Sequence, residues 1–224
     1  LTGAGISAES GIRTFRDSNG LWENHRIEEV ATPEGWRANP QLVWNFYQQR
    51  RRQLLEVEPN QGHEALVRLE NYLENFLLVT QNVDDLHERA GSKNLIHMHG
   101  ELAKLRCESC HHVETLMDEE HLKETFLSCS EGEGRLRPHI VWFNEMPMGM
   151  AEIEKALSEC DVFIAIGTSG HVYPAANFLH TAKRRGAHTI GINLEPPENV
   201  HFFDEFFQGK AGEILPLLVE KWTR

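Results

Sequence analysis

Short apolar runs that end in polar or glycine residues recur along the chain, at residues 76–80, 162–166 and 189–192. The stretches between them carry helical patterns, in which apolar positions fall on one face. Strands that alternate with helices in this way are typical of a parallel sheet covered by helices on both faces. The pattern therefore predicts an α/β fold built on a Rossmann-like sheet.

Two stretches do not fit this alternation. Asn39 and Pro40 supply the N-cap and first residue of a helix that runs to about residue 57, and Asn60 begins a second helix. We expect these helices to form a hairpin inserted after the first glycine loop. Residues 104–136, with a CxxC motif and many charges, are expected to form a small zinc-ribbon-like satellite. The predicted domains are a Rossmann-like domain of residues 1–38, 74–103 and 137–224, and a small domain of residues 39–73 and 104–136.

Charge and cysteine content narrow the function classes. The 22 Lys and Arg and 34 Asp and Glu residues give a formal net charge of −12. This charge argues against a broad nucleic-acid surface, because neutralising phosphates needs an excess of cations. No apolar run approaches the roughly 20 residues of a membrane helix, so we expect no membrane partner either. The four cysteines form no disulfide framework, which indicates a reduced, cytoplasmic protein.

The N-terminal segment TGAGISA carries a candidate phosphate-binding loop. Gly3, Gly5 and Ala8 have the G-x-G-x-x-A spacing that lets backbone approach a pyrophosphate, although a plain tight turn explains the glycines equally well. A dehydrogenase would continue with a second strand ending in an acid that binds the ribose. Residues 14–22 instead have the composition of a loop. The pattern keeps a dinucleotide as ligand and argues against hydride transfer.

Polar clusters follow three of the expected strands, at Gln81-Asn82-Val83-Asp84, Gly167-Thr168-Ser169 and Asn193-Leu194-Glu195. Any one of them is explained by turn chemistry or a helix cap. In open α/β sheets, however, ligands bind at the carboxyl ends of the strands. Three such ends together with a glycine loop indicate one extended ligand with ribose and amide groups, and Glu195 or Asn193 then binds the ribose.

His99 stands out among the 13 histidines because it ends the apolar segment NLIHMHG, between the QNVD and CxxC motifs. A neutral imidazole at this place can act as a general base near pH 7. We therefore select it as the catalytic candidate.

The motifs GAGIS, TFR, QNVD, HG, CxxC, GTS and NLE occur in this order along the chain. The ordered set resembles the sirtuins, NAD-dependent protein-lysine deacylases, and is most similar to their bacterial, CobB-type members. The resemblance implies that an acyl-lysine oxygen attacks the anomeric carbon of the nicotinamide ribose and displaces nicotinamide. It implies that His99 takes a proton from a ribose hydroxyl, after which the acyl group passes to ADP-ribose. Free lysine and O-acyl-ADP-ribose are the expected products.

The resemblance also implies a set of cofactor-binding residues. Asn82 and Asp84 would hold the nicotinamide amide and its ribose, and the glycine loop would close over NAD. The full set is Gly3, Ala4, Gly5, Ile6, Ser7, Phe15, Arg16, Trp22, Gln81, Asn82, Val83, Asp84, Gly167, Thr168, Ser169, Asn193, Leu194, Glu195 and Ala211.

The substrate implied by the resemblance is an acylated-lysine protein or peptide that pairs as an added strand. Val141 and Phe143, with Glu145, match one of the two pairing segments, and the loop at residues 170–173 matches the other. Main-chain pairing is nearly blind to sequence, so selectivity comes mostly from the acyl end. At Asn144 the family usually has Gly. Asn tolerates a positive φ better than most residues, so we expect the turn to persist.

The helical segment NFYQQRRR offers a site for an acidic acyl group. Tyr47 and Arg50 are three residues apart and so share a helix face, whereas Arg51 and Arg52 are expected to form a solvated basic patch. Tyr-x-x-Arg at this point resembles the sirtuins that remove malonyl and succinyl groups. Arg50 offers a planar fork to a carboxylate, and the Tyr47 hydroxyl adds a third hydrogen bond. We expect a deacylase that accepts both acetyl and succinyl groups.

The resemblance implies a structural zinc site that this chain fills incompletely. Cys107, Cys110 and Cys129 match three of four ligands, but Cys129 is followed by Ser130-Glu131-Gly132 and not by a fourth cysteine. Three thiolates with a histidine form a sound zinc site, so His111, His112 or a nearby acid is a candidate fourth ligand. A degenerate, metal-free satellite is the alternative.

Two other functions use the same pocket. An ADP-ribosyltransferase would pass the sugar of NAD to a side chain, and a non-catalytic sensor would bind NAD or ADP-ribose without turnover. A sensor needs neither His99 nor the Tyr47 and Arg50 pair, so these residues favour the deacylase. We expect the chain to act as a monomer.

Overall fold

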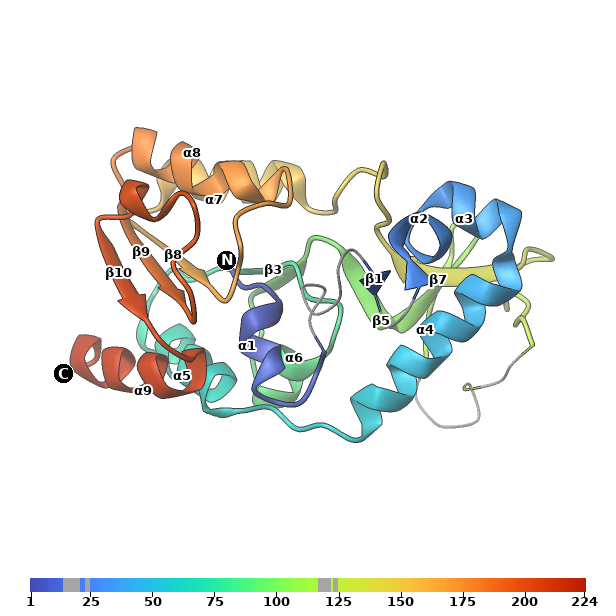
Figure 1. The fold of residues 1–224 in the computed structure, drawn as a ribbon, viewed down its shortest axis with the longest axis horizontal. Coiled ribbons are helices and arrows are strands. Elements are labelled where there is room, and N and C mark those ends of the chain that lie inside the picture. The colour runs from blue at the N-terminus through green and yellow to red at the C-terminus, as the bar shows by residue number, and fades with distance from the viewer. Residues whose placement is uncertain (14–20, 23–24, 117–121, 123–124) are drawn as a thin grey trace.

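A parallel sheet forms the centre of the larger part of the molecule (Figure 1). The computed structural model describes residues 1–13, 21–22, 25–116, 122 and 125–224. Thr2 bridges both Thr80 and Ile166 in parallel, so the N-terminal segment lies between β3 and β8. The paired strands are β3 (Leu78–Thr80) with β4 (Leu95–His97), β8 (Val162–Ile166) with β9 (His188–Asn193), and β9 with β10 (Glu205–Gln208).

Helices cover both faces of this sheet, as predicted. Phe163 and Ala165 on β8 point to one face, where they pack against α7 (Met150–Glu159) and α8 (Phe178–Arg184). Ile166 points to the opposite face and packs with α5 (Gln61–Tyr72) and α9 (Ala211–Trp222). The period-2 alternation of a strand thus builds two separate cores from one apolar run.

The expected helical hairpin is wrong in its packing. α4 (Pro40–Leu55) and α5 do form, and each begins at its predicted cap: Asn39 accepts from the Leu42 N–H at 3.1 Å and Asn60 from the Gly62 N–H at 2.9 Å. However, α5 packs along α9 against the parallel sheet, whereas α4 lies at the other end of the molecule (Figure 1). Helix caps can be identified from the local sequence, but which element packs against the apolar face of each helix depends on the tertiary structure.

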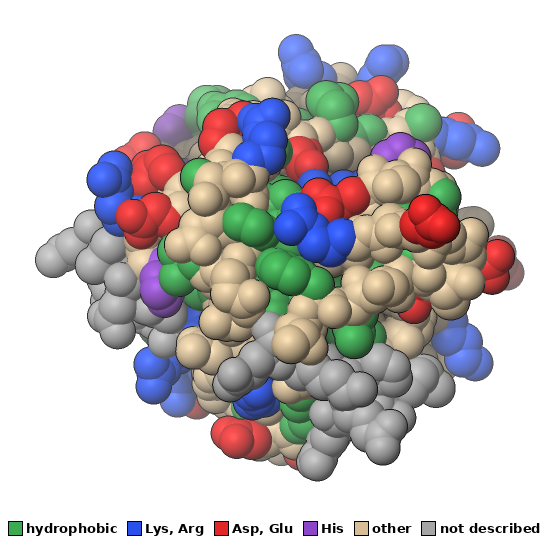
Figure 2. Space-filling view, turned by 90° about the vertical axis from the view of Figure 1, so that its right-hand side faces the viewer, with side chains coloured by type: hydrophobic (Ala, Val, Ile, Leu, Met, Phe, Trp, Pro, Cys, Tyr) green, Lys and Arg blue, Asp and Glu red, His purple; other side chains and the backbone are tan. Residues whose placement is uncertain are grey.

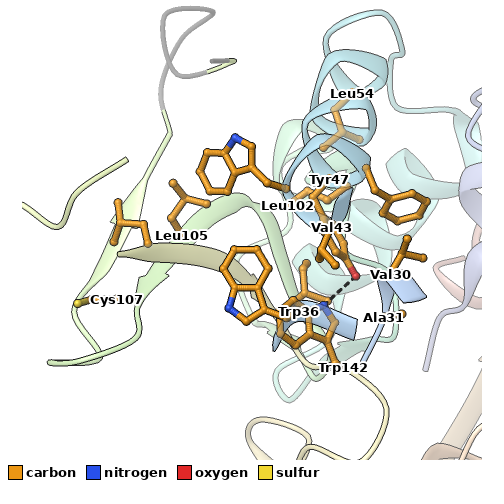
Figure 3. Close-up of a cluster of buried hydrophobic side chains, with 14 of the residues drawn as sticks. Val30, Ala31, Trp36, Val43, Tyr47, Leu54, Leu102, Leu105, Cys107 and Trp142 are labelled. Atoms are coloured by element: carbon orange, nitrogen blue, oxygen red, sulfur yellow. Dashed lines mark hydrogen bonds between the residues drawn. The ribbon is translucent and has the colours of Figure 1, made fainter. Parts of the chain in front are cut away.

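The second core joins α4 to a small antiparallel sheet. This sheet consists of β5 (Gly100–Cys107), β6 (Val113–Thr115) and β7 (Leu136–Ile140), in the order β6-β5-β7. Trp44 and Tyr47 on α4 and Trp142 after β7 are almost completely buried between them. The Trp142 Nε1–H donates to the Tyr47 hydroxyl at 3.0 Å (Figure 3). The predicted satellite is therefore present as an antiparallel module that carries the cysteines.

Short elements complete the described chain. They are α1 (Ala4–Ala8), β1 (Leu21–Trp22), β2 (His25–Arg26), α2 (Ile27–Val30), α3 (Pro33–Ala38) and α6 (Leu86–Ala90), with 3-10 turns at Ala175–Asn177 and Val200–Phe202. The two-residue ladder of β1 and β2 is more structure than the loop expected there. The boundaries given for two domains stay a prediction.

The surface shows both signs of charge. On the face that Figure 2 shows, which is the α2–α4 end of the molecule, basic and acidic side chains lie among one another. Although the net charge of the chain is −12, the acidic side chains do not form a separate patch on this face. Among the helices in the described part of the chain, none combines the length and the apolar character needed to cross a bilayer.

Candidate active site

The glycine loop lies directly against the end of β8. The Gly3 N–H donates to the Ile166 carbonyl at 3.0 Å and the Gly5 N–H to the Gly167 carbonyl at 2.8 Å. A Cβ at Gly5 would lie 2.6 Å from the Gly167 Cα, so a side chain has no room there. Gly167 itself has φ of +61°, which favours glycine. These glycines are thus required by close backbone packing, and the Gly3 and Gly5 amides are used within the protein.

Hydrogen bonds between polar side chains join the three strand ends into one surface, which we call the polar floor of the site. The Asn82 Nδ2 donates to the Gly3 carbonyl at 3.1 Å and to the Ser7 hydroxyl at 2.9 Å. The Gln81 Nε2 donates to the Thr168 hydroxyl at 2.9 Å, and the Asn193 Nδ2 donates to the Thr168 carbonyl at 3.1 Å. The residues selected from the ends of β3, β8 and β9 therefore meet at one edge of the sheet.

Asp84 places a carboxyl group in this floor with almost no exposure to solvent, at 4%. Burial raises its pKa to about 6, although hydrogen bonds from Ser7 and from the Leu86 N–H and the charge of His97 favour the ionised form. When Asp84 is ionised despite this burial, its carboxylate is a strong hydrogen-bond acceptor for hydroxyl groups.

His99 is oriented by the backbone of the neighbouring strand end. Its Nδ1 lies 3.1 Å from the Gln81 carbonyl, which can only accept, so Nδ1 carries the proton and Nε2 is the basic nitrogen. Burial lowers the pKa of His99, more than the hydrogen bond to Gln81 raises it. The ring is therefore neutral at pH 7 and able to take a proton.

Other cofactor candidates are placed less directly. Phe15 and Arg16 lie outside the described residues, and for Trp22 only the backbone strand is described. Ile6 points away from the floor into the core between α5 and α9. Leu194 and Glu195 are exposed at the end of β9, while Ala211 is buried at the start of α9.

The predicted acyl-pocket pair lies on α4. Tyr47 is completely buried, and Arg50 is half-buried with its guanidinium carbon 4.8 Å from the centre of the Phe46 ring. Arg50 lines a hollow of about 260 Å³. The other residues around this hollow are polar or charged: Arg13, Gln49, Arg52, Gln53 and Glu56.

The expected role of Arg51 is wrong. Arg52 is exposed as predicted, but Arg51 is only 4% exposed and its charge lies near Tyr47. Its Nε donates to the Leu102 carbonyl at 2.6 Å and its Nη1 to Gln48 at 2.9 Å. Arg51 lies four residues after Tyr47, so it shares the inner face of the helix as well, and its hydrogen bonds join α4 to β5.

The first candidate peptide-pairing segment follows β7. Glu145 accepts two hydrogen bonds from Arg137, at 2.7 and 2.9 Å, and a third from the Trp142 N–H at 2.9 Å, which fixes the turn. Asn144 has φ of +71°, so the expectation that Asn keeps the turn is confirmed. Phe143 is 45% exposed next to this turn, whereas Val141 is partly buried and donates its N–H to the His99 carbonyl at 2.8 Å.

Three cysteines of the antiparallel module converge. The sulfur atoms of Cys107, Cys110 and Cys129 lie within 4.8 Å of one another. Within the described ranges, neither His111 nor His112 nor an acidic side chain joins the group at this distance. A Cβ on Gly132, three residues after Cys129, would lie 3.9 Å from the Cys110 sulfur.

His97, which the sequence motifs did not single out, lies beside the candidate site. Its ring lies against the same turn as His99 and bridges to Glu88 on α6. The HMH spacing is the sequence signal for this pair, although His99 lies in the turn that follows β4 and not on the strand itself.

Comparison with known proteins agrees with this geometry. The family model described as "Sir2 family" matches residues 3–174. The chain is 56% identical to an NAD-dependent protein deacylase of Salmonella typhimurium, covering 100% of this chain and 83% of that protein. It is 58% identical to one of Pasteurella multocida, covering 96% and 93%.

Solved structures give the same answer at the level of the fold. A crystal structure of a Sir2 homolog–NAD complex superposes with a TM-score of 0.92 at 40% identity, over 100% of this chain and 89% of that chain. A Sir2 protein bound to a myristoylated histone peptide superposes with a TM-score of 0.79 at 34% identity, over 98% and 88%. With the parallel sheet, the polar floor at its edge and the cysteine-bearing module all present, the chain belongs to the Sir2 family.

Proposed function

We propose that this Sir2-family chain, an NAD-dependent protein deacylase, removes succinyl and malonyl groups as well as acetyl groups from lysine side chains. Nicotinamide and O-acyl-ADP-ribose are the other products. The observation that best supports the deacylation itself is the neutral His99, whose basic Nε2 is set by the Nδ1 hydrogen bond to the Gln81 carbonyl. A base fixed in this tautomer can deprotonate a hydroxyl without changing its own orientation.

NAD, when bound, supplies the ribose carbon that accepts the acyl oxygen and the nicotinamide that leaves. The residues at the sheet edge suit this molecule. Asp84 is an ionisable acceptor for ribose hydroxyls or the nicotinamide amide, and Asn82 is held beside it by Ser7. His99 accepts a proton from a ribose hydroxyl. Relatives named NAD-dependent protein deacylases and a neighbour solved with NAD support this cofactor.

The acidic acyl group is assigned to Tyr47 and Arg50. Arg50 borders a hollow that Arg13, Arg52 and Glu56 also line, so three cations outweigh one acid and the potential there favours a carboxylate. The Tyr47 oxygen accepts from Trp142, which fixes the direction of the hydroxyl. Burial raises the pKa of Tyr47, so the hydroxyl stays protonated at neutral pH. An uncharged acetyl group needs neither contact, which is why both substrates are expected.

The three cysteines suit a structural zinc ion. In tetrahedral coordination with Zn–S bonds of about 2.3 Å, two sulfur atoms lie roughly 3.8 Å apart, and the Cys110 and Cys129 sulfur atoms lie 3.6 Å apart. Backbone N–H groups of Cys110 and Ser109 lower the pKa of Cys107 to about 7, whereas burial raises the pKa of Cys129 to about 11. A divalent cation would allow all three to ionise together.

The overall activity is tested with acetyl- and succinyl-lysine peptides, with and without NAD. We expect acyl loss by mass spectrometry only with NAD, with one nicotinamide released for each acyl group lost. His99→Ala should lower turnover by roughly 10²–10⁴-fold, because the base is removed. The exposed His201→Ala serves as control. Acyl loss without NAD would refute the function, and nicotinamide release without acyl loss would favour ADP-ribosyl transfer.

The acyl specificity is tested with Arg50→Met, alone and together with Tyr47→Phe. The ratio of desuccinylation to deacetylation should fall by about 10- to 150-fold, because a charge-assisted contact contributes about 1.5–3 kcal/mol. Arg184→Met, at an exposed arginine of α8 that does not line the hollow, should leave the ratio unchanged. Tyr47→Phe leaves the buried Trp142 N–H without its acceptor, so deacetylation by the same sample checks folding. An equal loss of both activities would contradict the assignment.

Asp84→Asn should separate stability from activity. Native Asp84, with its raised pKa, holds its proton up to about pH 6, while the unfolded chain loses it near 3.8. Wild-type stability therefore falls as pH rises through this window, and the asparagine variant escapes that loss. We expect its free energy of unfolding at pH 7.5 to exceed the wild-type value by about 1–3 kcal/mol, and the difference to vanish near pH 4.

The measurement is urea unfolding at several pH values, with the exposed Asp161→Asn as control. Deacylation by Asp84→Asn should be lost at pH 7.5. A variant that is less stable than the wild type at pH 7.5 would show that Asp84 has a stabilising partner instead of a functional one.

Gly132→Cys tests the zinc site. Protein purified without chelator should contain about one zinc ion per chain, because three thiolates bind it. A fourth thiolate should slow the loss of zinc to a colorimetric chelator by about tenfold or more. Cys107→Ser should abolish zinc content, and Cys160→Ser, at the end of α7 and outside the module, should leave it unchanged. Metal-free wild-type protein would favour the degenerate satellite.

A further inference from the structure

The two histidines of the HMHG segment hold two consecutive carbonyl groups of the facing strand end. His99 lies with its Nδ1 3.1 Å from the Gln81 carbonyl, and His97 lies with its Nδ1 3.1 Å from the Asn82 carbonyl. The parallel register of β3 and β4, which pairs Thr80 with His97, brings these groups together. The next carbonyl, of Val83, accepts from the Leu102 N–H at 2.7 Å. The backbone that leads to Asp84 is therefore held at every carbonyl from residue 81 to 83.

The two rings differ in protonation. The His97 Nε2 lies 2.6 Å from a carboxylate oxygen of Glu88, and its Nδ1 faces a carbonyl. Both partners only accept, so both nitrogens of His97 donate and the ring is an imidazolium. Its side chain is 7% exposed, and that of Glu88 is 39% exposed, so the pair is sheltered but reachable by solvent.

Glu88, His97 and Glu101 lie within 4.8 Å of one another, a grouping that metal sites also have. Here each member already has a partner, because Glu101 accepts from Lys104 at 2.7 Å and Glu88 accepts from His97. The geometry is that of an ion-pair network around a protonated ring.

We propose that His97 is a positioning residue for the deacylation: as an imidazolium held by Glu88, it fixes the turn that carries Asn82 and Asp84 and places a positive charge behind that turn. This inference rests on the function proposed above for Asp84 and His99. His97 contacts neither the reacting atoms nor the cofactor in this role. It acts through the Asn82 carbonyl and through its charge.

The charge of His97 has a direct consequence for Asp84. A nearby cation favours the ionised form, and the charge of His97 is among the influences that lower the pKa of Asp84 against the larger effect of burial. Burial alone would lower the pKa of His97, but the hydrogen bond to Glu88 and the charge of Glu88 raise it overall. The titratable and charged groups that face His97 come from α6 and the turn before it and from β5: Asp84, Asp85, His87, Glu88, Glu101 and Lys104.

The test is His97→Gln, assayed for kcat/KM toward NAD from pH 6 to pH 8.5. Loss of the fixed turn should lower kcat/KM about tenfold at pH 8, because a charge-assisted hydrogen bond is removed. Loss of the cation raises the pKa of Asp84, so the acid limb moves to higher pH. For a rise of one unit, the loss should be about fivefold greater at pH 6 than at pH 8. His188→Gln, at an exposed histidine that lies 2.7 Å from Glu205, is the matched control and should change neither value.

A purely structural role for His97 would lower activity by the same factor at every pH, and that result overturns the proposal.

Nitrogen-15 NMR of the histidine rings gives a second test that needs no variant to be active. At pH 7 both nitrogens of His97 should be protonated, whereas His99 should carry one proton, on Nδ1. Glu88→Gln should leave His97 neutral at that pH. A neutral His97 in the wild type refutes the inference, while an inactive wild type refutes the proposed function and leaves the NMR result to stand by itself.

Discussion

The structure depends on a contact between backbones that leaves no room for side chains. Residues 2–6 run between the ends of β3 and β8, where Thr2 bridges both strands and Gly5 lies against Gly167. Because this contact brings the glycine loop within hydrogen-bond distance of two strand ends, the side chains of Ser7, Asn82 and Thr168 share one polar floor. A larger residue at Gly5 would separate the loop from the sheet and disperse the site.

The titratable groups of this site are buried, and the neighbours of each group shift its pKa in a different direction. Burial raises the pKa of Asp84 and lowers that of His99, whereas the hydrogen bond and charge of Glu88 raise the pKa of His97 against the effect of burial. One turn, residues 81–83, connects all three through its carbonyl groups. Perturbed groups of opposite tendency in one place are typical of catalytic sites.

The second core links the proposed acyl site to the cysteine module. Tyr47 on α4 accepts from Trp142, Trp142 follows β7, and β7 pairs with β5, which carries Cys107. Arg51 adds a hydrogen bond from α4 to β5. Helix α4 and the module therefore pack as one body, so a metal that stabilises the cysteines would also support the helix that carries Arg50.

The sequence by itself determined the parallel sheet, the helix caps at Asn39 and Asn60, and the positive φ of Asn144, because these depend on local patterns. Its short motifs, taken in order, also determined the resemblance to the Sir2 family. Strand ends with polar residues also predicted which segments meet, since parallel strands share an edge. The tertiary structure decided what local pattern cannot encode. It paired α5 with α9 instead of α4, buried Arg51, and placed His97 against Glu88. Each of these depends on which face of one element meets a distant element, and that choice is made by burial and by charge across the whole fold.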